Sequence, residues 1–152
     1  MMERQTMRYA ACGLDNVVIE GAAPMIDDNG DEVLMVPHVA RLHKVIAEDI
    51  INAETSLTGK ELRFLRTEAG WTQAELARSI QREALTVSRW ERGECPIDLT
   101  TDFTLRVLFM EKLSLRFDGE MTDVIEHIVS RVDGHLIRID GSDPTDPQRI
   151  AA

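Results

Sequence analysis

The chain has 152 residues, 43% of them hydrophobic, which is enough for one compact domain or two small ones with a buried core. Its 17 Lys and Arg residues against 27 Asp and Glu residues give a net charge of −10, which disfavours a protein that binds nucleic acid loosely over its whole surface. No apolar run reaches transmembrane length and the start of the sequence lacks the apolar segment of a signal peptide, so we expect a cytoplasmic protein.

Residues 7–36 have the pattern of β-strands. Val17–Ile19 is a β-branched run. Met25–Asp27 and Val33–Val36 flank the turn signal Asp28–Asp31, which predicts a hairpin. We therefore expect a small sheet of about three strands, which needs another element packed on it to be stable.

Residues 37–54 predict a helix of roughly four turns that covers this sheet. Val39, Leu42, Ile46 and Ile50 follow one another at i, i+3, i+7 and i+11. His43 lies beside this stripe and is expected to be a half-buried structural residue rather than a metal ligand.

Two capping boxes predict where the next two helices begin. Thr58 with Glu61 opens a helix over residues 59–69, which ends at Gly70. Thr72 with Glu75 opens a second helix, whose inward positions are Ala74, Leu76, Ala77 and Ile80.

A third short helix follows a tight turn and ends at Arg92–Gly93. Val87 and Trp90 form its buried stripe. The residues left on its outer face are Glu83, Ala84, Leu85, Thr86, Ser88 and Arg89. A short helix with small, polar and basic residues outside has the right shape for the DNA major groove, although an ordinary helical hairpin has the same periodicity.

The Leu76–Ala77 pair and the closing run Ser88–Gly93 resemble the Cro/C1 (Xre-type) helix-turn-helix family. One departure is visible, because that family usually has Gly followed by an apolar residue where this chain has Gln81 and Arg82. Gln lacks the freedom of Gly at positive φ, which predicts an altered or strained turn. From Gly59 to Gly93 there are seven basic and five acidic residues, whereas the remainder has ten basic and 22 acidic ones. A segment with a slight excess of basic residues within an otherwise acidic chain favours specific over loose binding of DNA.

After a loop at residues 94–97, residues 99–113 predict a longer helix that is apolar on more than one face, with Phe103, Val107 and Met110 on one stripe. The apolar residues on its several faces indicate either a contact with a second subunit or simple burial in the core. Residues 119–132 predict a further amphipathic helix, and residues 135–140 a short strand that joins the N-terminal sheet or pairs with its copy in a dimer.

The expected fold class is α+β, mainly α, in four parts. Residues 1–56 form a small β-rich domain with one helix, and residues 57–115 form the helix-turn-helix domain. Residues 116–140 form a helix-strand unit expected to dimerise, and residues 141–152 a disordered tail.

Two further segments extend the resemblance. Tyr9–Val17 and Leu57–Arg66, ahead of the helix-turn-helix, together resemble the MqsA (YgiT-type) antitoxin-like regulators, over roughly residues 8–113. The best-known members bind zinc through two Cys-x-x-Cys pairs in the N-terminal domain. This chain has only Cys12 there and Cys95 elsewhere, which predicts a zinc-free branch without a cofactor and without a disulfide.

The resemblance implies a homodimer that binds a palindromic double-stranded operator, often in its own promoter. The candidate DNA-binding residues are Gln73, Arg78, Arg82, Glu83, Ala84, Leu85, Thr86, Ser88, Arg89 and Arg92. Carried over by position, Gln73 touches a phosphate, while Ala84, Leu85 and Arg89 face base edges. Arg89 suits bidentate contact with guanine, against the alternatives of a phosphate contact or a surface ion pair. Arg78, Arg82 and Arg92 neutralise phosphates.

The predicted function is that of a DNA-binding transcriptional repressor and antitoxin that represses its own operon, with a small basic toxin as a possible partner. The alternative is a stand-alone regulator without a toxin. We do not expect an enzyme, because the sequence shows no nucleophile–base pair, no paired carboxylates in an apolar setting and no phosphate-cradling glycine loop.

Overall fold

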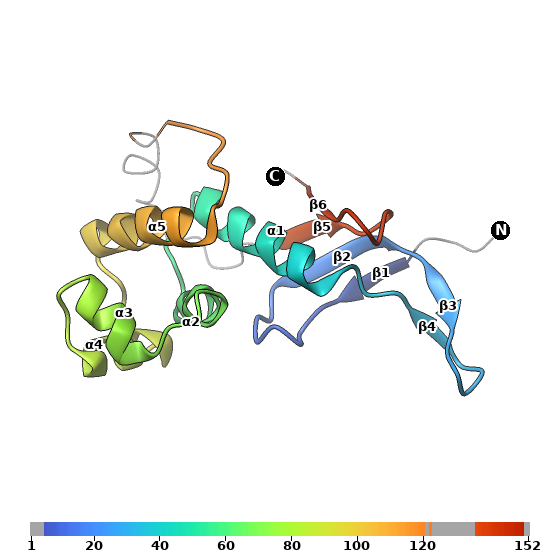
Figure 1. Ribbon diagram of the computed structural model, residues 1–152, viewed down its shortest axis with the longest axis horizontal. Helices are drawn as coiled ribbons and strands as arrows, with labels where there is room; N and C mark the ends of the chain where they lie inside the picture. Colours follow the sequence, from blue (N-terminus) through green and yellow to red (C-terminus); the bar gives the residue numbers. More distant parts are fainter. Residues whose placement is uncertain (1–4, 121, 123–135, 151–152) are drawn as a thin grey trace. The chain divides into compact units, whose positions relative to one another are not determined.

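The chain folds into two compact units, one made of residues 1–49 and 136–152 and the other of residues 50–135. The structure is a computed structural model that describes residues 5–120, 122 and 136–150. The described residues form five α-helices and six β-strands, which confirms the predicted α+β class (Figure 1).

The first unit is built on a four-stranded sheet. Its strands are β1 (Gln5–Arg8), β2 (Val17–Ala22), β5 (Ile137–Asp140) and β6 (Gln148–Arg149), in the order β1-β2-β5-β6. β2 and β5 are parallel, while the two outer pairs are antiparallel. The sequence left open whether the strand near residues 135–140 joins the N-terminal sheet or pairs with its copy in a dimer, and the structure shows it in the N-terminal sheet.

Alternation along β2 and β5 gives this sheet one apolar face. Val17 pairs with Ile137 and Ile19 with Ile139, and all four side chains are buried. Arg138 and Glu20 face the other way, where they form an ion pair. Strands that alternate in this manner have one face on a core and the other toward solvent.

Helix α1 (Val39–Asn52) supplies part of that core, as the sequence predicted. Leu42 and Ile46 are fully buried. His43 is half-buried, as predicted, and its Nε2 lies 2.9 Å from the hydroxyl of Tyr9.

The predicted disorder of the tail is wrong for residues 141–150. His38 donates a backbone hydrogen bond to the carbonyl of Pro144 at 2.9 Å, and Ile150 donates to Arg138 at 2.9 Å. Arg149 forms an ion pair with Asp49 at 3.1 Å. Backbone pairing and this ion pair hold the segment. Neither kind of contact produces the apolar periodicity from which a strand is predicted in a sequence.

Strands β3 (Pro24–Ile26) and β4 (Glu32–Leu34) form the predicted hairpin, with Met25 opposite Val33. They make a sheet of their own, so the expectation of a single three-stranded sheet is wrong. Gly21 adopts a positive φ of 73° just before the chain leaves β2, and the proline at position 24 has no N–H for a ladder. Both features break the pairing between the two sheets.

The second unit is a helical bundle of α2 (Gly59–Glu68), α3 (Gln73–Ser79), α4 (Ala84–Glu91) and α5 (Leu99–Leu113). Its buried apolar residues include Leu62, Leu65, Leu76, Val87, Trp90, Leu105 and Phe109. The predicted helix over residues 119–132 lies almost entirely outside the described residues. Among the described helices, none is long and apolar enough to cross a membrane.

A buried ion pair within α5 organises this unit. Asp102 and Arg106 have side chains that are only 1% and 2% exposed, and the Arg106 Nε lies 2.6 Å from an Asp102 oxygen. The other Asp102 oxygen accepts a hydrogen bond from the backbone N–H of Leu57 at 2.7 Å. The rest of the guanidinium donates to backbone carbonyls of Ile50, Ile51, Ala53 and Thr55. One arginine therefore satisfies carbonyls at the end of α1 that have no partner within a helix.

We expect Arg106→Met to lower the free energy of unfolding of this unit by about 3–5 kcal/mol, because it leaves the buried Asp102 carboxylate without its counter-charge and removes the donor to several buried carbonyls. Urea denaturation followed by tryptophan fluorescence measures this unit selectively, since Trp71 and Trp90 are the only tryptophans of the chain.

Arg63→Met is the matched control, because Arg63 is exposed on α2 of the same unit. We expect it to change the free energy of unfolding by less than about 0.5 kcal/mol. Equal losses in the two variants would contradict the role assigned to the Asp102–Arg106 pair.

Candidate nucleic-acid interface

Helices α2 and α3 begin at the residues that the sequence predicted. Thr58 accepts a hydrogen bond from the backbone of Glu61, and the Glu61 carboxylate accepts one from the backbone of Thr58. Thr72 and Glu75 make the same reciprocal pair, at 3.1 Å and 2.8 Å. Capping boxes of this kind satisfy N–H groups that a helix start leaves open, so the first turn of each helix is fixed by its own sequence.

The turn between α3 and α4 is a Schellman motif with glutamine at the glycine position. Arg82 donates to the carbonyl of Ala77 at 2.8 Å, and Gln81 donates to that of Arg78 at 3.3 Å. The φ of Gln81 is 56°, whereas Gly70 and Gly93 have a φ of 71° at the same position after α2 and α4. The turn therefore keeps the hydrogen bonds of a glycine-terminated helix with a glutamine in the left-handed conformation, and this agrees with the strain that the sequence predicted.

Helix α4 buries one face and exposes the other. Val87 and Trp90 are buried, as predicted, whereas Leu85 is 51% exposed. Arg89, one turn beyond Leu85, is also exposed, as are Glu83 and Ala84 at the start of the helix, while Thr86 and Ser88 are half-buried. The outer face thus combines an apolar side chain, small groups and a guanidinium.

Gly59 sets the distance between α2 and the end of α4. A Cβ atom at this position would lie 2.2 Å from the carbonyl oxygen of Trp90 and 2.8 Å from that of Glu91. No side chain fits there without a shift of the backbone of α4. Sequence reasoning missed this role, because a glycine at the first position of a helix has no local signature of a close approach.

A half-buried polar cluster fixes α4 against α2 and α3. The guanidinium of Arg66 holds the Glu91 carboxylate through its Nε at 2.5 Å and its Nη2 at 3.2 Å, and its Nη1 donates to the carbonyl of Trp71. Gln73 donates from its side-chain amide to the same carboxylate at 2.6 Å. Arg66 and Glu91 were not predicted site residues, since the 25 positions that separate them leave no pattern in the sequence.

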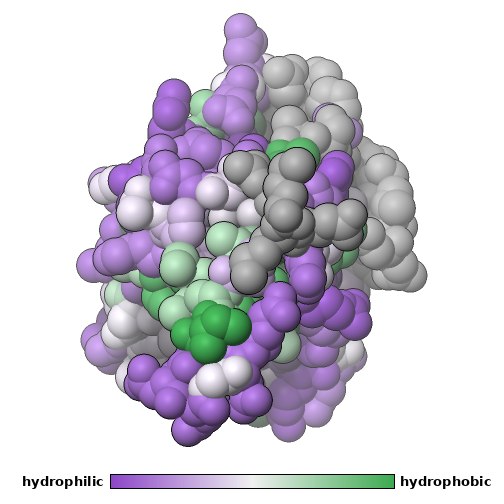
Figure 2. All heavy atoms as spheres, turned by 90° about the vertical axis from the view of Figure 1, so that its right-hand side faces the viewer, coloured by the Kyte–Doolittle hydropathy of each residue, from purple (hydrophilic) through white to green (hydrophobic). Residues whose placement is uncertain are grey.

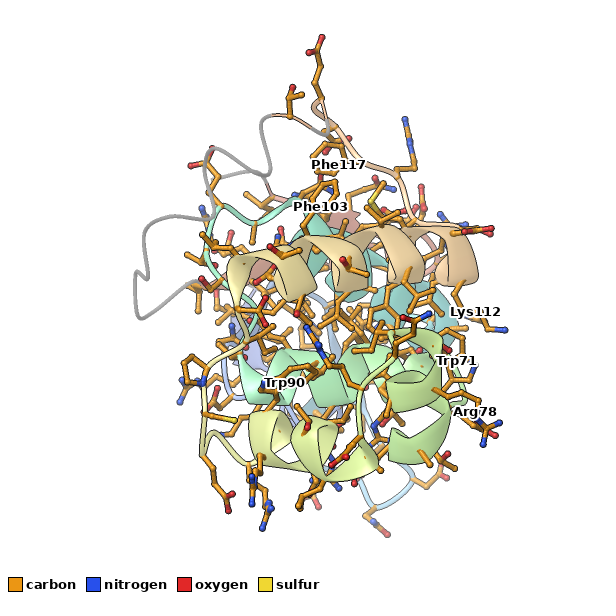
Figure 3. The ribbon with its side chains drawn as sticks, turned by 90° about the vertical axis from the view of Figure 1, so that its left-hand side faces the viewer. Trp71, Arg78, Trp90, Phe103, Lys112 and Phe117 are labelled. Carbon is orange, nitrogen blue, oxygen red and sulfur yellow. The ribbon has the colours of Figure 1, made fainter. Side chains whose placement is uncertain are left out.

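The candidate phosphate-binding residues differ in whether their side-chain donors already bind other groups of the protein. Arg78 on α3 points away from the bundle (Figure 3), and no hydrogen bond or ion pair within the described part of the chain engages its guanidinium or that of Arg89. Arg92 is paired with Glu94 at 3.1 Å. Gln73 uses one of its two amide N–H groups on Glu91 and keeps the other. Ala74, predicted to face inward, is exposed, because α3 buries only the side of the helix that carries Leu76 and Ala77.

Arg82 lies near the carboxylate that caps α5. Asp98 accepts hydrogen bonds from the hydroxyl and the backbone N–H of Thr101, at 2.7 Å and 3.1 Å. Chiefly through the bond from the Thr101 side chain, and to a smaller extent through the charge of Arg82, the pKa of Asp98 is held below its ordinary value. The positive charge of Arg82 is therefore partly offset within the protein.

Residues 58–106 match a family model described as a helix-turn-helix domain. This segment is a helix-turn-helix domain. The match covers about a third of the chain and includes every helix of the bundle from α2 into α5. Comparisons with curated proteins and with solved structures gave no match. The domain indicates a DNA-binding, Xre-like regulator.

We expect Gln81→Gly to raise the free energy of unfolding of the helix-turn-helix domain by about 1 kcal/mol, because Gly adopts the left-handed conformation without steric cost. Urea denaturation followed by tryptophan fluorescence is the measurement. Gln81→Ala serves as the control, since alanine keeps the Cβ and should not stabilise the domain; a gain as large as that of the glycine variant would contradict strain at this turn.

Proposed function

We propose that the protein is a sequence-specific transcriptional repressor that binds a palindromic operator as a homodimer. The observation that carries the proposal is the outer face of α4, where Leu85 and Arg89 are exposed on a helix held by Gly59 and the Arg66–Glu91 pair. A rigid helix with unengaged side chains is what recognition of base edges in the major groove requires.

In this proposal α4 lies in the major groove. Arg89 donates to guanine O6 and N7, while Leu85 and Ala84 contact thymine methyl groups. Glu83, Thr86 and Ser88 border this contact. The groups placed for phosphates are Arg78, Arg82, Arg92 and the free amide N–H of Gln73.

A two-fold dimer then presents two copies of α4 about 34–36 Å apart, the length of one turn of DNA, or at a multiple of that distance. An operator with two matching half-sites is the consequence. When it overlaps a promoter, including that of the protein's own gene, the bound dimer blocks transcription.

We expect Arg89→Ala to weaken binding to the preferred duplex by about 1–3 kcal/mol and to relax the preference at the contacted base pair. The preferred duplex is first selected from random double-stranded DNA with the wild-type protein, and affinities are measured by fluorescence anisotropy at fixed salt. An unchanged affinity and preference would remove Arg89 from the readout.

Arg78→Ala is the matched comparison, since it removes another exposed guanidinium, from the neighbouring helix. We expect it to weaken binding to all sequences alike and to lower the slope of log affinity against log salt by about 1 for each lost contact. Thermal melts of both variants should overlay that of the wild type, because neither side chain is buried.

We further propose an antitoxin role of the MqsA (YgiT-type) kind, for which the acidic balance outside residues 59–93 is the support, since it suits a small basic toxin. The test is co-expression with a small basic protein encoded next to this gene, read out as growth. Rescue of growth together with a stoichiometric complex would support the role. Failure of both would leave a stand-alone regulator.

A further inference from the structure

Exposed apolar side chains are concentrated around the β3–β4 hairpin. Of the eight large hydrophobic side chains that are exposed in the described part of the chain, five lie between positions 25 and 39, namely Met25, Ile26, Val33, Val36 and Val39. The hairpin lies at the end of its unit that faces the viewer in Figure 2, where hydrophobic side chains are bordered by hydrophilic ones. A two-stranded hairpin is marginal in water, so it gains stability when a further strand covers it.

The strand edges of this unit differ in their capacity to accept such a strand. β5 is central in its sheet and β6 has two residues. The pairing of β1 is irregular between Gln5 and Met7. On the hairpin, β3 begins with Pro24, which has no N–H to offer and so blunts that edge. The edge of β4, Glu32–Leu34, has neither a proline nor an irregularity.

The hydrogen bonds of the hairpin show which backbone groups of β4 point outward. Bonds of 2.9 Å join positions 27 and 31 near the turn, and positions 23 and 35 at the other end. Because hydrogen-bonded pairs alternate in antiparallel strands, Met25 and Val33 are the bonded pair between them. The N–H and C=O groups of Glu32 and Leu34 therefore face away from β3, and no backbone hydrogen bond within the described residues engages them.

The hairpin is acidic and has no counter-charge of its own. Residues 9–40 contain six Asp and Glu residues and no Lys or Arg. Elsewhere in the same unit, acidic side chains such as that of Glu20 are paired with an arginine. The carboxylates of Asp28, Asp31 and Glu32, in contrast, make no ion pair or hydrogen bond within the described residues. This charge repels the phosphates of nucleic acids and anionic membranes as well as a second acidic hairpin, so a basic partner is complementary to it.

We propose that the β4 edge binds an extended basic segment of another protein, which adds to the hairpin as a third, antiparallel strand. Main-chain hydrogen bonds to Glu32 and Leu34 hold the segment, as in other cases where a peptide extends a sheet. Ion pairs with the unengaged carboxylates favour basic segments over acidic ones. The inference rests on the hairpin alone and requires neither the operator nor the antitoxin role.

The order of side chains along β4 determines the sequence that the bound segment needs. Asp31 and Glu32 are acidic, whereas Val33 and Leu34, which follow them, are apolar. Side chains directly opposite each other on antiparallel strands interact, and opposite charges or two apolar groups are the favourable pairs. An antiparallel segment therefore needs two apolar residues followed by two basic ones in the direction of its own chain.

The first test is an NMR titration of the isotope-labelled full chain with the synthetic peptide Thr-Val-Val-Lys-Arg-Thr. We expect the amide signals of Glu32 and Leu34 to move, because their outward N–H groups gain hydrogen bonds, and that of Val33, which is bonded within the hairpin, to move least. The control peptide Thr-Val-Val-Glu-Glu-Thr keeps the apolar residues and reverses the charge.

Three outcomes of this titration would overturn the proposal. The first is that the signals of Glu32 and Leu34 do not move with the basic peptide, and the second is that they move equally with both peptides. The third is that they move with protein concentration in the absence of peptide, because a second copy of the chain would then occupy this edge.

The second test separates charge from backbone pairing within the protein. Glu32→Gln removes one carboxylate and keeps the N–H group, so we expect it to weaken the basic peptide about two- to fivefold, as for the loss of one exposed charge pair. Glu32→Pro also removes the N–H group and should weaken the peptide at least about tenfold.

Ile26→Pro is the matched control for the proline variant. Ile26 is the direct cross-strand partner of Glu32, is also exposed, and has its backbone N–H on the opposite edge of the hairpin. We expect this variant to bind the peptide within about twofold of the wild type. Equal losses in the two proline variants, or no loss in Glu32→Pro, would contradict pairing at the β4 edge, and Glu32→Gln decides the result if a proline variant fails to fold.

Binding of the same samples to the selected duplex separates this proposal from the proposed function. A Glu32→Pro variant that loses the peptide and binds the duplex as the wild type does supports the interface and leaves the repressor function standing. A wild type that binds the duplex but not the basic peptide overturns the interface alone. A wild type that binds the peptide, more weakly as salt rises, but selects no duplex supports the interface and defeats the proposed function.

Discussion

The helix-turn-helix unit depends on one buried arginine. Arg106 and Asp102 lie on α5, yet the groups they satisfy belong to the end of α1 and to the backbone of residues 53–57, just before α2. Burying such a pair is favourable only when nearly every donor and acceptor finds a partner. Here both carboxylate oxygens and three guanidinium nitrogens do. This network fastens the backbone between α1 and α2 to α5.

Within the bundle, three unrelated devices hold α4 in place. Gly59 allows its last carbonyls to approach α2, the Arg66–Glu91 pair ties its end to the last turn of α2, and the turn at Gln81 sets its direction. Each device acts on the backbone or on a half-buried charge, so the outer face of α4 takes no part in stabilising the fold. Leu85 and Arg89 are consequently not needed for packing, which agrees with the role in recognition proposed for them.

The first unit is held together by segments from both ends of the chain. β5 inserts next to β2 in parallel, and residues 141–150 return to α1 through backbone hydrogen bonds and the Asp49–Arg149 ion pair. The strand near residues 135–140 is thereby used inside the unit and is not available to pair with a copy of itself. The β3–β4 hairpin remains outside that sheet and forms a two-stranded sheet of its own.

The sequence by itself determined the features that depend on neighbours a few positions apart. The capping boxes at Thr58 and Thr72, the buried stripe of Val87 and Trp90 and the hairpin around Asp28 all arise from contacts within one turn or one helix, and the structure has them where they were predicted. The DNA-contacting residues remain predictions, although the exposed face of α4 agrees with the choice of Leu85 and Arg89. Only the tertiary structure decided that β5 joins β2 across more than a hundred residues, that the tail is ordered as far as residue 150, and that Arg106 and Glu91 act on distant backbone and charge. Those contacts depend on which segments meet after folding, and no periodicity or local propensity along the chain records that.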